Sequence, residues 1–267
     1  MRCMLGLDRV DNGRVTFDGR AYVEFEKPLT QVGSLLDAGD AHKGRSARNH
    51  LRWIAMTHGL PTKRVDEVLH KVGMSEVAKT KVGKFSLGMR QRLGLATALL
   101  GDPKVIILDE PANGLDPEGI RWTREVMRHL ADEGRSVLVS SHQLGELSLV
   151  ADDLVVIGQG KLISAGPLDQ FMTQHAKTWV KVMSPQLTTL MELAKQQGAT
   201  VEMQKDSAHV YGMSARDIGD LAGSQGVVLH ELSPQTGSLE QAFLDATDAA
   251  VEYRGEKSNN VWEAPRP

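Results

Sequence analysis

Val105-Ile-Ile-Leu-Asp-Glu-Pro111 consists of four aliphatic residues followed by two carboxylates and a proline. The aliphatic run predicts a strand that is buried on both faces of a parallel sheet. Asp109 and Glu110 follow at its C-terminal end, where open α/β sheets hold their ligands. There Asp109 can hold Mg²⁺, directly or through water, and Glu110 can orient or deprotonate an attacking water. A strand that merely ends in an acidic turn is the alternative.

Three further segments surround this strand in a fixed order. They are Lys84-Phe-Ser-Leu-Gly-Met-Arg-Gln-Arg-Leu-Gly94, then Asn113-Gly-Leu-Asp-Pro117, and then Ser136-Val-Leu-Val-Ser-Ser-His142, a second buried-strand pattern that ends in a histidine. Together the four segments resemble the nucleotide-binding domain of an ABC (ATP-binding cassette) ATPase. The resemblance implies an α/β fold of the P-loop NTPase type with a helical subdomain at about residues 40–100. It also implies ATP and Mg²⁺ as cofactors.

The segment around Ser86 predicts an anion site. Ser86 can cap the helix that follows, which leaves free amides at its N-terminus beside Gly88, where no side chain blocks close approach. The resemblance implies that Ser86 and Gly88 bind the γ-phosphate of ATP held by the opposite subunit of a head-to-tail dimer. The family usually has two glycines after the serine, and Leu87 takes the first position here. An ordinary capped helix is the alternative.

Three more residues receive roles from the resemblance. His142 corresponds to the switch histidine that contacts the γ-phosphate and the attacking water. Asp116 is expected to cap a helix that begins at Pro117, and it resembles the residue that signals across the dimer. Asp37 takes the place of a glutamine that usually serves Mg²⁺ and water. A carboxylate can also bind Mg²⁺, but an exposed loop acid explains Asp37 equally well.

One expected motif is missing from the sequence. ABC ATPases carry G-x-x-x-x-G-K-[ST], and neither Gly-Lys pair, at residues 83–84 and 160–161, is followed by serine or threonine. Met1, Met4 and Leu5 recur at helical spacing without a capping residue before them. We therefore expect an incomplete domain, truncated at the N-terminus within the helix that follows the phosphate loop.

This truncation leads to an expectation about the sheet. We expect the strand that precedes the phosphate loop in the family to lie beside the acidic strand. Without that strand, Val105–Leu108 would present an unpaired apolar edge. The sequence leaves open whether this chain folds and binds ATP alone.

The remaining patterns divide the chain into three parts. Beyond about residue 175, strands and helices are expected in the order βαββαβ, the arrangement of ferredoxin-like modules, followed by one more helix. The strands are expected at 178–183, 200–203, 209–211 and 227–232, and the helices at 185–197, 214–222 and 239–247. We assign residues 1–174 to the ABC ATPase domain, 175–248 to a C-terminal α+β accessory domain and 249–267 to a flexible tail.

Composition limits the partners and the cellular compartment that are expected for the protein. A net charge of −3 gives no basic field, so no nucleic-acid partner is expected. The single cysteine, Cys3, allows no intrachain disulfide and fits a reducing compartment. The longest aliphatic runs are far shorter than the ~20 residues that span a bilayer, and there is no signal-peptide pattern. We expect a cytoplasmic chain that reaches the inner face of the cell membrane through a partner.

Two classes of function compete at this point. The first is the ATP-hydrolysing subunit of a multidrug or antibiotic-type exporter, with a separate transmembrane permease and a second ABC ATPase subunit, identical or different. The second is a truncated or degenerate subunit that binds a partner without catalysis. Soluble ABC proteins of translation fit less well, because they normally carry two cassettes.

Overall fold

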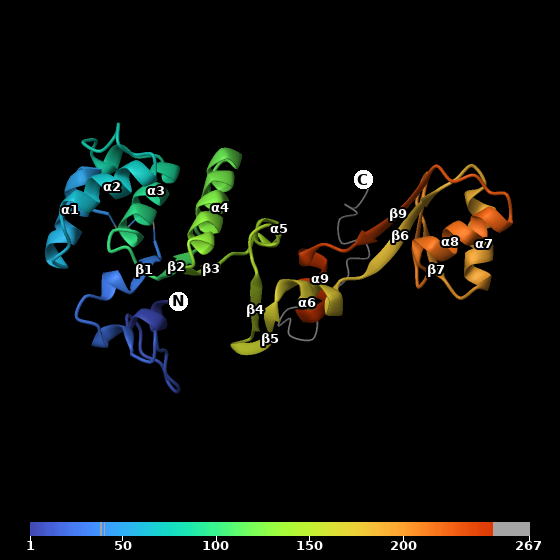
Figure 1. Cartoon of the computed structure of the whole chain (residues 1–267), viewed down its shortest axis with the longest axis horizontal. Coiled ribbons are helices and arrows are strands. Elements are labelled where there is room, and N and C mark those ends of the chain that lie inside the picture. Colours follow the sequence, from blue (N-terminus) through green and yellow to red (C-terminus); the bar gives the residue numbers. More distant parts are fainter. Residues whose placement is uncertain (38, 40, 248–267) are drawn as a thin grey trace, which may run out of the picture. The chain divides into compact units, whose positions relative to one another are not determined.

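The computed structural model describes residues 1–37, 39 and 41–247, which belong to two compact units. The first unit is Met1–Val150, and the second begins at Ala151 (Figure 1). The boundary predicted at residues 174 and 175 rests on the change of sequence pattern there, and it stays a prediction. The tail predicted for residues 249–267 lies outside the described residues.

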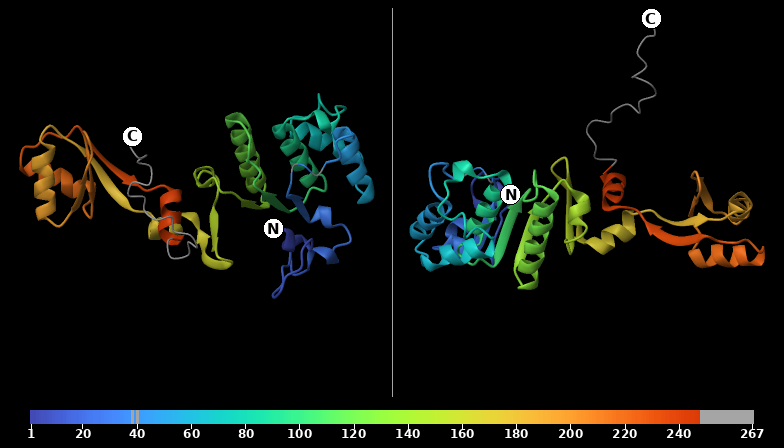
Figure 2. Two further views of the ribbon diagram at one scale, coloured as in Figure 1. Left: turned by 180° about the vertical axis from the view of Figure 1, so that it is seen from behind. Right: turned by 90° about the horizontal axis from the view of Figure 1, so that it is seen from above.

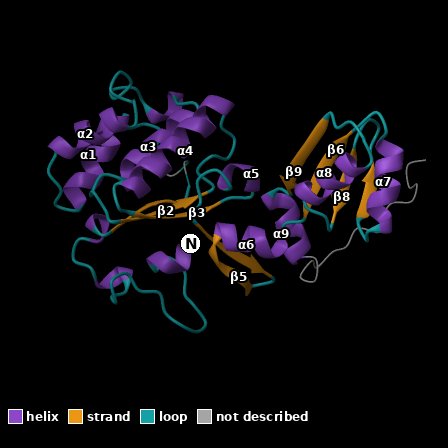
Figure 3. Cartoon of the chain, turned by 45° about the vertical axis from the view of Figure 1, so that its right-hand side comes forward, coloured by secondary structure: helices purple, strands orange, loops and turns teal. Residues whose placement is uncertain are grey.

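A sheet of three parallel strands forms the centre of the first unit (Figure 3). Its strands are β1 (Val32–Leu35), β2 (Val105–Asp109) and β3 (Ser136–Ser140), in the order β1-β2-β3. Because all three strands run in the same direction, their C-terminal ends meet at one edge of the sheet. The acidic strand β2 is central, and its three middle residues are buried as predicted.

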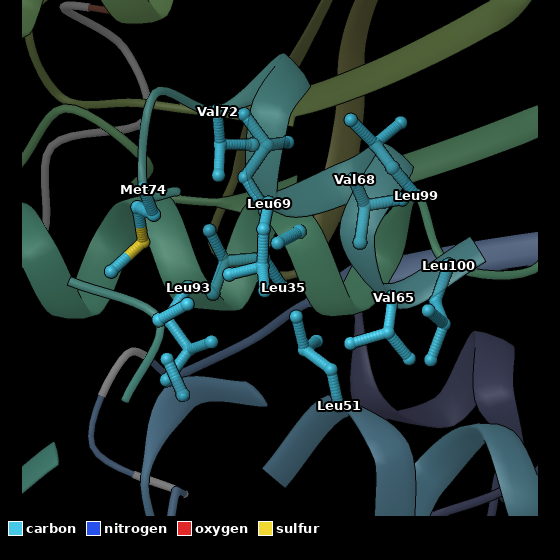
Figure 4. Packing of buried hydrophobic residues seen from close by; sticks show 14 of the residues in the cluster. Leu35, Leu51, Val65, Val68, Leu69, Val72, Met74, Leu93, Leu99 and Leu100 are labelled. Carbon is cyan, nitrogen blue, oxygen red and sulfur yellow. The ribbon is translucent and has the colours of Figure 1, made fainter. Parts of the chain in front are cut away.

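Helices cover one face of this sheet (Figures 1 and 3). They are α1 (Ala47–Thr57), α2 (Lys63–Lys71), α3 (Leu87–Ala98) and α4 (Pro117–Asp132), and the short α5 (Leu144–Leu147) follows β3. Leu51, Leu69 and Leu93 are fully buried where these helices meet (Figure 4). The structure therefore contains the helical subdomain expected at about residues 40–100 and the helix expected to begin at Pro117.

The N-terminal segment contacts the opposite face. Leu5, in the 3-10 helix η1 (Arg2–Leu5), packs with Val32 of β1 and Ile107 of β2. Further 3-10 turns are η2 (Tyr22–Glu24), η3 (Pro28–Thr30) and η4 (Val82–Lys84). The apolar positions 1, 4 and 5 thus face the core, although the helix that carries them is only one turn long.

Two expectations about the strands were wrong. β2 pairs with β1 on one side and β3 on the other, so Val105–Leu108 is not an unpaired edge. The pattern at Ser136–His142 is not a buried strand either, because Leu138 of β3 is 37% exposed. β3 is an outer strand in the described part of the chain. Its residues Val137 and Val139 pack against the helical face, whereas the N-terminal segment does not extend over Leu138.

Close packing between β1 and α3 depends on a glycine. A Cβ atom at Gly33 would overlap the backbone carbonyl of Ala98 and crowd the ring of Pro103. Backbone atoms cannot rotate away as a flexible side chain can. The approach of α3 to the sheet therefore requires glycine at this position.

We predict that Gly33→Ala lowers the free energy of unfolding by about 1–3 kcal/mol or more, because the added methyl forces strand and helix apart. Denaturant unfolding followed by circular dichroism measures this change. Gly223→Ala in the second unit is the control, since nothing lies within 4 Å of its added methyl. Alanine favours a helix by about 0.5–1 kcal/mol over glycine, so the control should not destabilise. A Gly33→Ala variant as stable as the wild type would contradict this packing.

The second unit begins with a hairpin and a helix. β4 (Asp153–Gly158) pairs antiparallel with β5 (Lys161–Pro167), and α6 (Leu168–His175) follows. Gln159 and Gly160 turn the chain with φ values of 49° and 70°, which suits a tight two-residue hairpin turn. The sequence did not predict α6, because its buried pair of Leu168 and Phe171 is too short a periodic run.

The rest of this unit is a four-stranded antiparallel sheet in the order β7-β8-β6-β9 (Figures 1 and 2). Its elements are β6 (Thr178–Met183), α7 (Leu187–Gln196), β7 (Thr200–Met203), β8 (Ala208–Tyr211), α8 (Ala215–Ser224), β9 (Glu231–Thr236) and α9 (Leu239–Thr247). This βαββαβ topology confirms the predicted ferredoxin-like module. β9 begins later than expected, because Val227 and Leu229 pack against the core from the loop that precedes it. No helix in the described part of the chain is long and apolar enough to cross a membrane.

Candidate functional site

The two predicted acidic residues are held by the neighbouring strand. Asp109, the last residue of β2, pairs in register with Ser140, the last residue of β3. The Ser140 hydroxyl donates a hydrogen bond to Oδ1 of Asp109. The amide nitrogen of Glu110 lies 3.1 Å from Oγ of Ser140 and 3.2 Å from the backbone carbonyl oxygen of Ser140. One serine therefore orients both acidic residues at the edge of the sheet.

Glu110 and His142 are in direct contact. Glu110 has a φ of 48°, so the chain turns sharply at the end of β2 in a conformation that few non-glycine residues adopt. Nδ1 of His142 lies 2.8 Å from Oε2 of Glu110. The side chains are 63% and 35% exposed, respectively. A carboxylate and an imidazole thus meet where water and a ligand can reach them.

Ser140 is a site residue that the sequence analysis did not identify. It lay within the quoted segment Ser136–His142, but nothing in the local pattern distinguishes it from Ser141. The Ser141 hydroxyl instead accepts a hydrogen bond from the amide of Gln143. Only the register with Asp109 gives Ser140 its function, and register is a property of the assembled sheet.

We predict that Ser140→Ala increases the hydrogen-exchange rate of the Glu110 amide severalfold, because the loss of one acceptor weakens its bonding. Ser141→Ala is the matched control, and it should leave this amide unchanged. Amide exchange measured by NMR distinguishes the two variants. Equal exchange rates in both would argue against the positioning role of Ser140.

The helix expected to bind an anion begins as predicted. Oγ of Ser86 accepts a hydrogen bond from the amide of Met89 at 3.2 Å. The amides of Leu87 and Gly88 belong to the first turn and have no acceptor within the helix. The positive end of the helix dipole adds to these donors. The N-terminus of α3 therefore has the groups that bind a phosphate.

Leu87, which departs from the family pattern, contacts another predicted segment. A Cβ atom at Gly114 would lie 2.6 Å from Cδ2 of Leu87, so the leucine occupies space left by that glycine. A Cβ atom at Gly88 would lie 3.6 Å from Cδ2 of Leu115, an ordinary contact distance. The start of α3 and the segment Asn113–Asp116 therefore pack together within one chain.

Asp116 and Asp37 differ in what their carboxylates do. Oδ1 of Asp116 accepts a hydrogen bond from the amide of Gly119 at 2.8 Å, which confirms its predicted role as N-cap of α4. Asp37 follows β1 at the same edge of the sheet as Asp109. Its Oδ1 accepts a hydrogen bond from the amide of Gly39 at 2.6 Å, so it closes its own loop. The structure brings Glu110 and His142 together but does not bring Asp37 to them.

The oxygen atoms at this edge suit Mg²⁺ that is shared with a nucleotide. Among the described residues, no group of three or more His, Cys, Asp or Glu side chains could hold a metal ion by itself. Mg²⁺ at nucleotide sites is usually bound by one or two carboxylates together with phosphate oxygens and water. Asp109 has a carboxylate of this kind at the C-terminal end of β2.

Comparison with known proteins identifies the family. A family model described as ABC transporter matches residues 1–113, and a domain of unknown function (DUF8746) matches residues 178–240. An uncharacterized ABC transporter ATP-binding protein of Bacillus subtilis, YhcH, is 34% identical over 261 residues, which cover 94% of this chain and 83% of that protein. This chain belongs to the ABC transporter ATP-binding proteins. Members of this family are ATPases.

Two named relatives and one solved structure add detail. The lantibiotic transport ATP-binding protein SrtF of Streptococcus pyogenes is 37% identical over 61% of this chain and 70% of its own length. The bacitracin transport ATP-binding protein BcrA of Bacillus licheniformis is 38% identical over 66% of this chain and 59% of its own length. The structure of an ATP-binding subunit of an ABC transporter superposes with a TM-score of 0.58 at 26% identity, covering 65% of this chain and 74% of that one.

Proposed function

We propose that this ABC transporter ATP-binding protein hydrolyses ATP to drive an exporter whose membrane-spanning permease is a separate subunit. The observation that carries the proposal is the grouping of Asp109, Glu110 and His142 at one edge of the sheet, with Ser140 orienting the acidic pair. Relatives whose names refer to bacitracin and lantibiotic transport support an exporter of the antibiotic type.

Each residue at this edge has a distinct role in the proposal. Asp109 holds Mg²⁺, directly or through water, while the Ser140 hydroxyl fixes the orientation of its carboxylate. When bound, Mg²⁺ neutralises charge on the phosphate oxygens. Glu110 orients the attacking water and accepts its proton at a carboxylate oxygen. His142, already at hydrogen-bond distance from Glu110, contacts the γ-phosphate and holds that water. Asp37 is the second candidate ligand for Mg²⁺, and its Oδ1 already accepts a hydrogen bond from the Gly39 amide.

A second subunit completes the nucleotide site in this proposal. Ser86 and Gly88 at the start of α3 donate amide hydrogen bonds to the γ-phosphate of ATP on the opposite subunit. Asp116, which begins α4, transmits the state of one site to the other. The packing of Leu87 against Gly114 supports joint movement of these two elements.

In this proposal the protein is attached to the membrane through its permease partner. The loop after Leu36 and the helical subdomain contact the permease, and closure of the ATPase dimer drives transport. The protein then works in the cytoplasm at the inner face of the membrane. Purification of the tagged chain with a polytopic membrane protein tests this arrangement, and copurification with ribosomes instead would contradict it.

We predict that Glu110→Gln, in a form of the chain extended with the phosphate-loop segment that ABC ATPases carry, retains ATP binding but reduces kcat by a factor of roughly 10² to 10⁴, because the amide cannot accept the proton. ATP hydrolysis and nucleotide binding are measured on the same preparation. Glu118→Gln in the first turn of α4 changes a nearby exposed acid and should leave kcat unchanged. Wild-type turnover by Glu110→Gln would exclude this role.

A further prediction concerns the site shared between subunits. The 267 residues contain no G-x-x-x-x-G-K-[ST] segment, so we expect no increase in melting temperature when millimolar Mg-ATP is added to the chain alone. Mixing with an intact ABC ATPase subunit should give at most one hydrolysing site per dimer. Ser86→Arg should abolish that activity, because the large side chain fills the phosphate site.

Ser46→Arg is the matched control for Ser86→Arg. Ser46 caps α1 in the same way, with its side chain accepting from the amide of Asn49, so both variants lose one helix cap. Only Ser86→Arg should lose activity. Equal loss of activity in both variants would show that the effect comes from a less stable helix. Unchanged activity in Ser86→Arg would refute the shared site.

A further inference from the structure

A small cavity lies behind the edge of the sheet that carries the acidic pair. Its volume is about 10 Å³, and residues from β1, β2, α3 and α4 line it together with Pro111. Leu108 precedes Asp109 in the chain, and Pro111 follows Glu110, so the wall of the cavity includes both neighbours of the acidic pair. The lining is mostly apolar, with Gln91 and Thr123 as its two polar residues. A space of this size is just large enough for about one water molecule.

The cavity contains a polar atom with no partner. Gln91 of α3, which lines the cavity, is only 8% exposed, and its side-chain oxygen Oε1 is buried without a hydrogen-bond partner among the described residues. Burying such an acceptor without a donor is costly. Native proteins usually satisfy these groups with protein or ordered water. Gln91 therefore calls for a donor inside the cavity.

Thr123 of α4 lines the same cavity and cannot supply that donor itself. Thr123 is 4% exposed, and its hydroxyl donates to the carbonyl of Gly119 at 2.9 Å. The single hydroxyl proton is thus committed, while the oxygen can still accept a hydrogen bond. Gln91 and Thr123 present two acceptors to one small space. One water molecule, with two O–H donors, satisfies both of them.

We propose that one buried water donates to Oε1 of Gln91 and to Oγ1 of Thr123, and that Gln91 thereby acts as a positioning residue for the segment 109–119. The bridge links α3, which begins after Ser86, to the first two turns of α4, which begins after Asp116. It braces the acidic pair from behind through Leu108 and Pro111. Any effect of this bridge on catalysis rests on the proposed function, whereas the bridge itself does not.

A second contact next to the bridge supports this link between α3 and α4. The guanidinium carbon of Arg92 lies 3.9 Å from the ring centroid of Trp122. Arg92 and Trp122 are the sequence neighbours of Gln91 and Thr123. The same guanidinium also donates to the carbonyl of Val72 at 3.1 Å. A cation–π contact therefore joins the two helices beside the proposed water bridge.

Hydrogen–deuterium exchange of the full chain tests the bridge without nucleotide. Gln91→Met and Thr123→Val keep side-chain size but remove one water partner each. Each should increase exchange across residues 109–119 by roughly three- to tenfold, since one buried hydrogen bond is lost. Thr123→Ser retains the hydroxyl and should exchange as the wild type does. The double variant Gln91→Met with Thr123→Val should match Thr123→Val alone, because that single variant has already lost the water together with the bond to the Gly119 carbonyl.

If Thr123 acts through packing alone, the variants should show the opposite pattern of hydrogen exchange. Thr123→Ser, which loses a methyl, would then increase exchange, whereas the isosteric Thr123→Val would not. Additive effects in the double variant would also overturn the shared water. Leu95→Met, on the same cavity wall, is the control and should leave segment 109–119 unchanged. Because no nucleotide is needed, failure here is distinguishable from failure of the proposed hydrolysis.

Discussion

The register between Asp109 and Ser140 is the constraint on which the candidate site depends. Parallel pairing aligns the last residues of β2 and β3, and the serine hydroxyl then reaches both members of the acidic pair. A shift of one residue would turn these side chains to opposite faces of the sheet. Buried apolar residues on both faces of β2 oppose that shift, because it would move Ile106 and Leu108 out of the cluster that they form with the helices. The hydrophobic core thus determines the geometry of the acidic edge.

Local patterns predicted most of the elements. Apolar periodicity identified the strands and most helices, and residue types known to cap helices identified the beginnings of α3 and α4. These signals are contained in a few neighbouring residues, so a sequence displays them directly. The ferredoxin-like module could be predicted for the same reason.

The order of strands could not be predicted in this way. Nothing near Val105 shows that β1 and β3 are its two neighbours, because pairing is decided between segments far apart in the chain. Gln91 is a similar case: it stands between Arg90 and Arg92, and polarity alone gives no sign that it is buried while they are less so. Residues whose roles arise from assembly, such as Ser140, require the folded structure.

The contact between Leu87 and Gly114 has a mechanical consequence. Gly114 has a φ of 69°, a backbone conformation that favours glycine, and the leucine methyl rests in the space above it. A rigid side chain pressed against bare backbone transmits displacement with little slack. The segment Asn113–Asp116 and the first turn of α3 are therefore expected to move together when a partner displaces either of them.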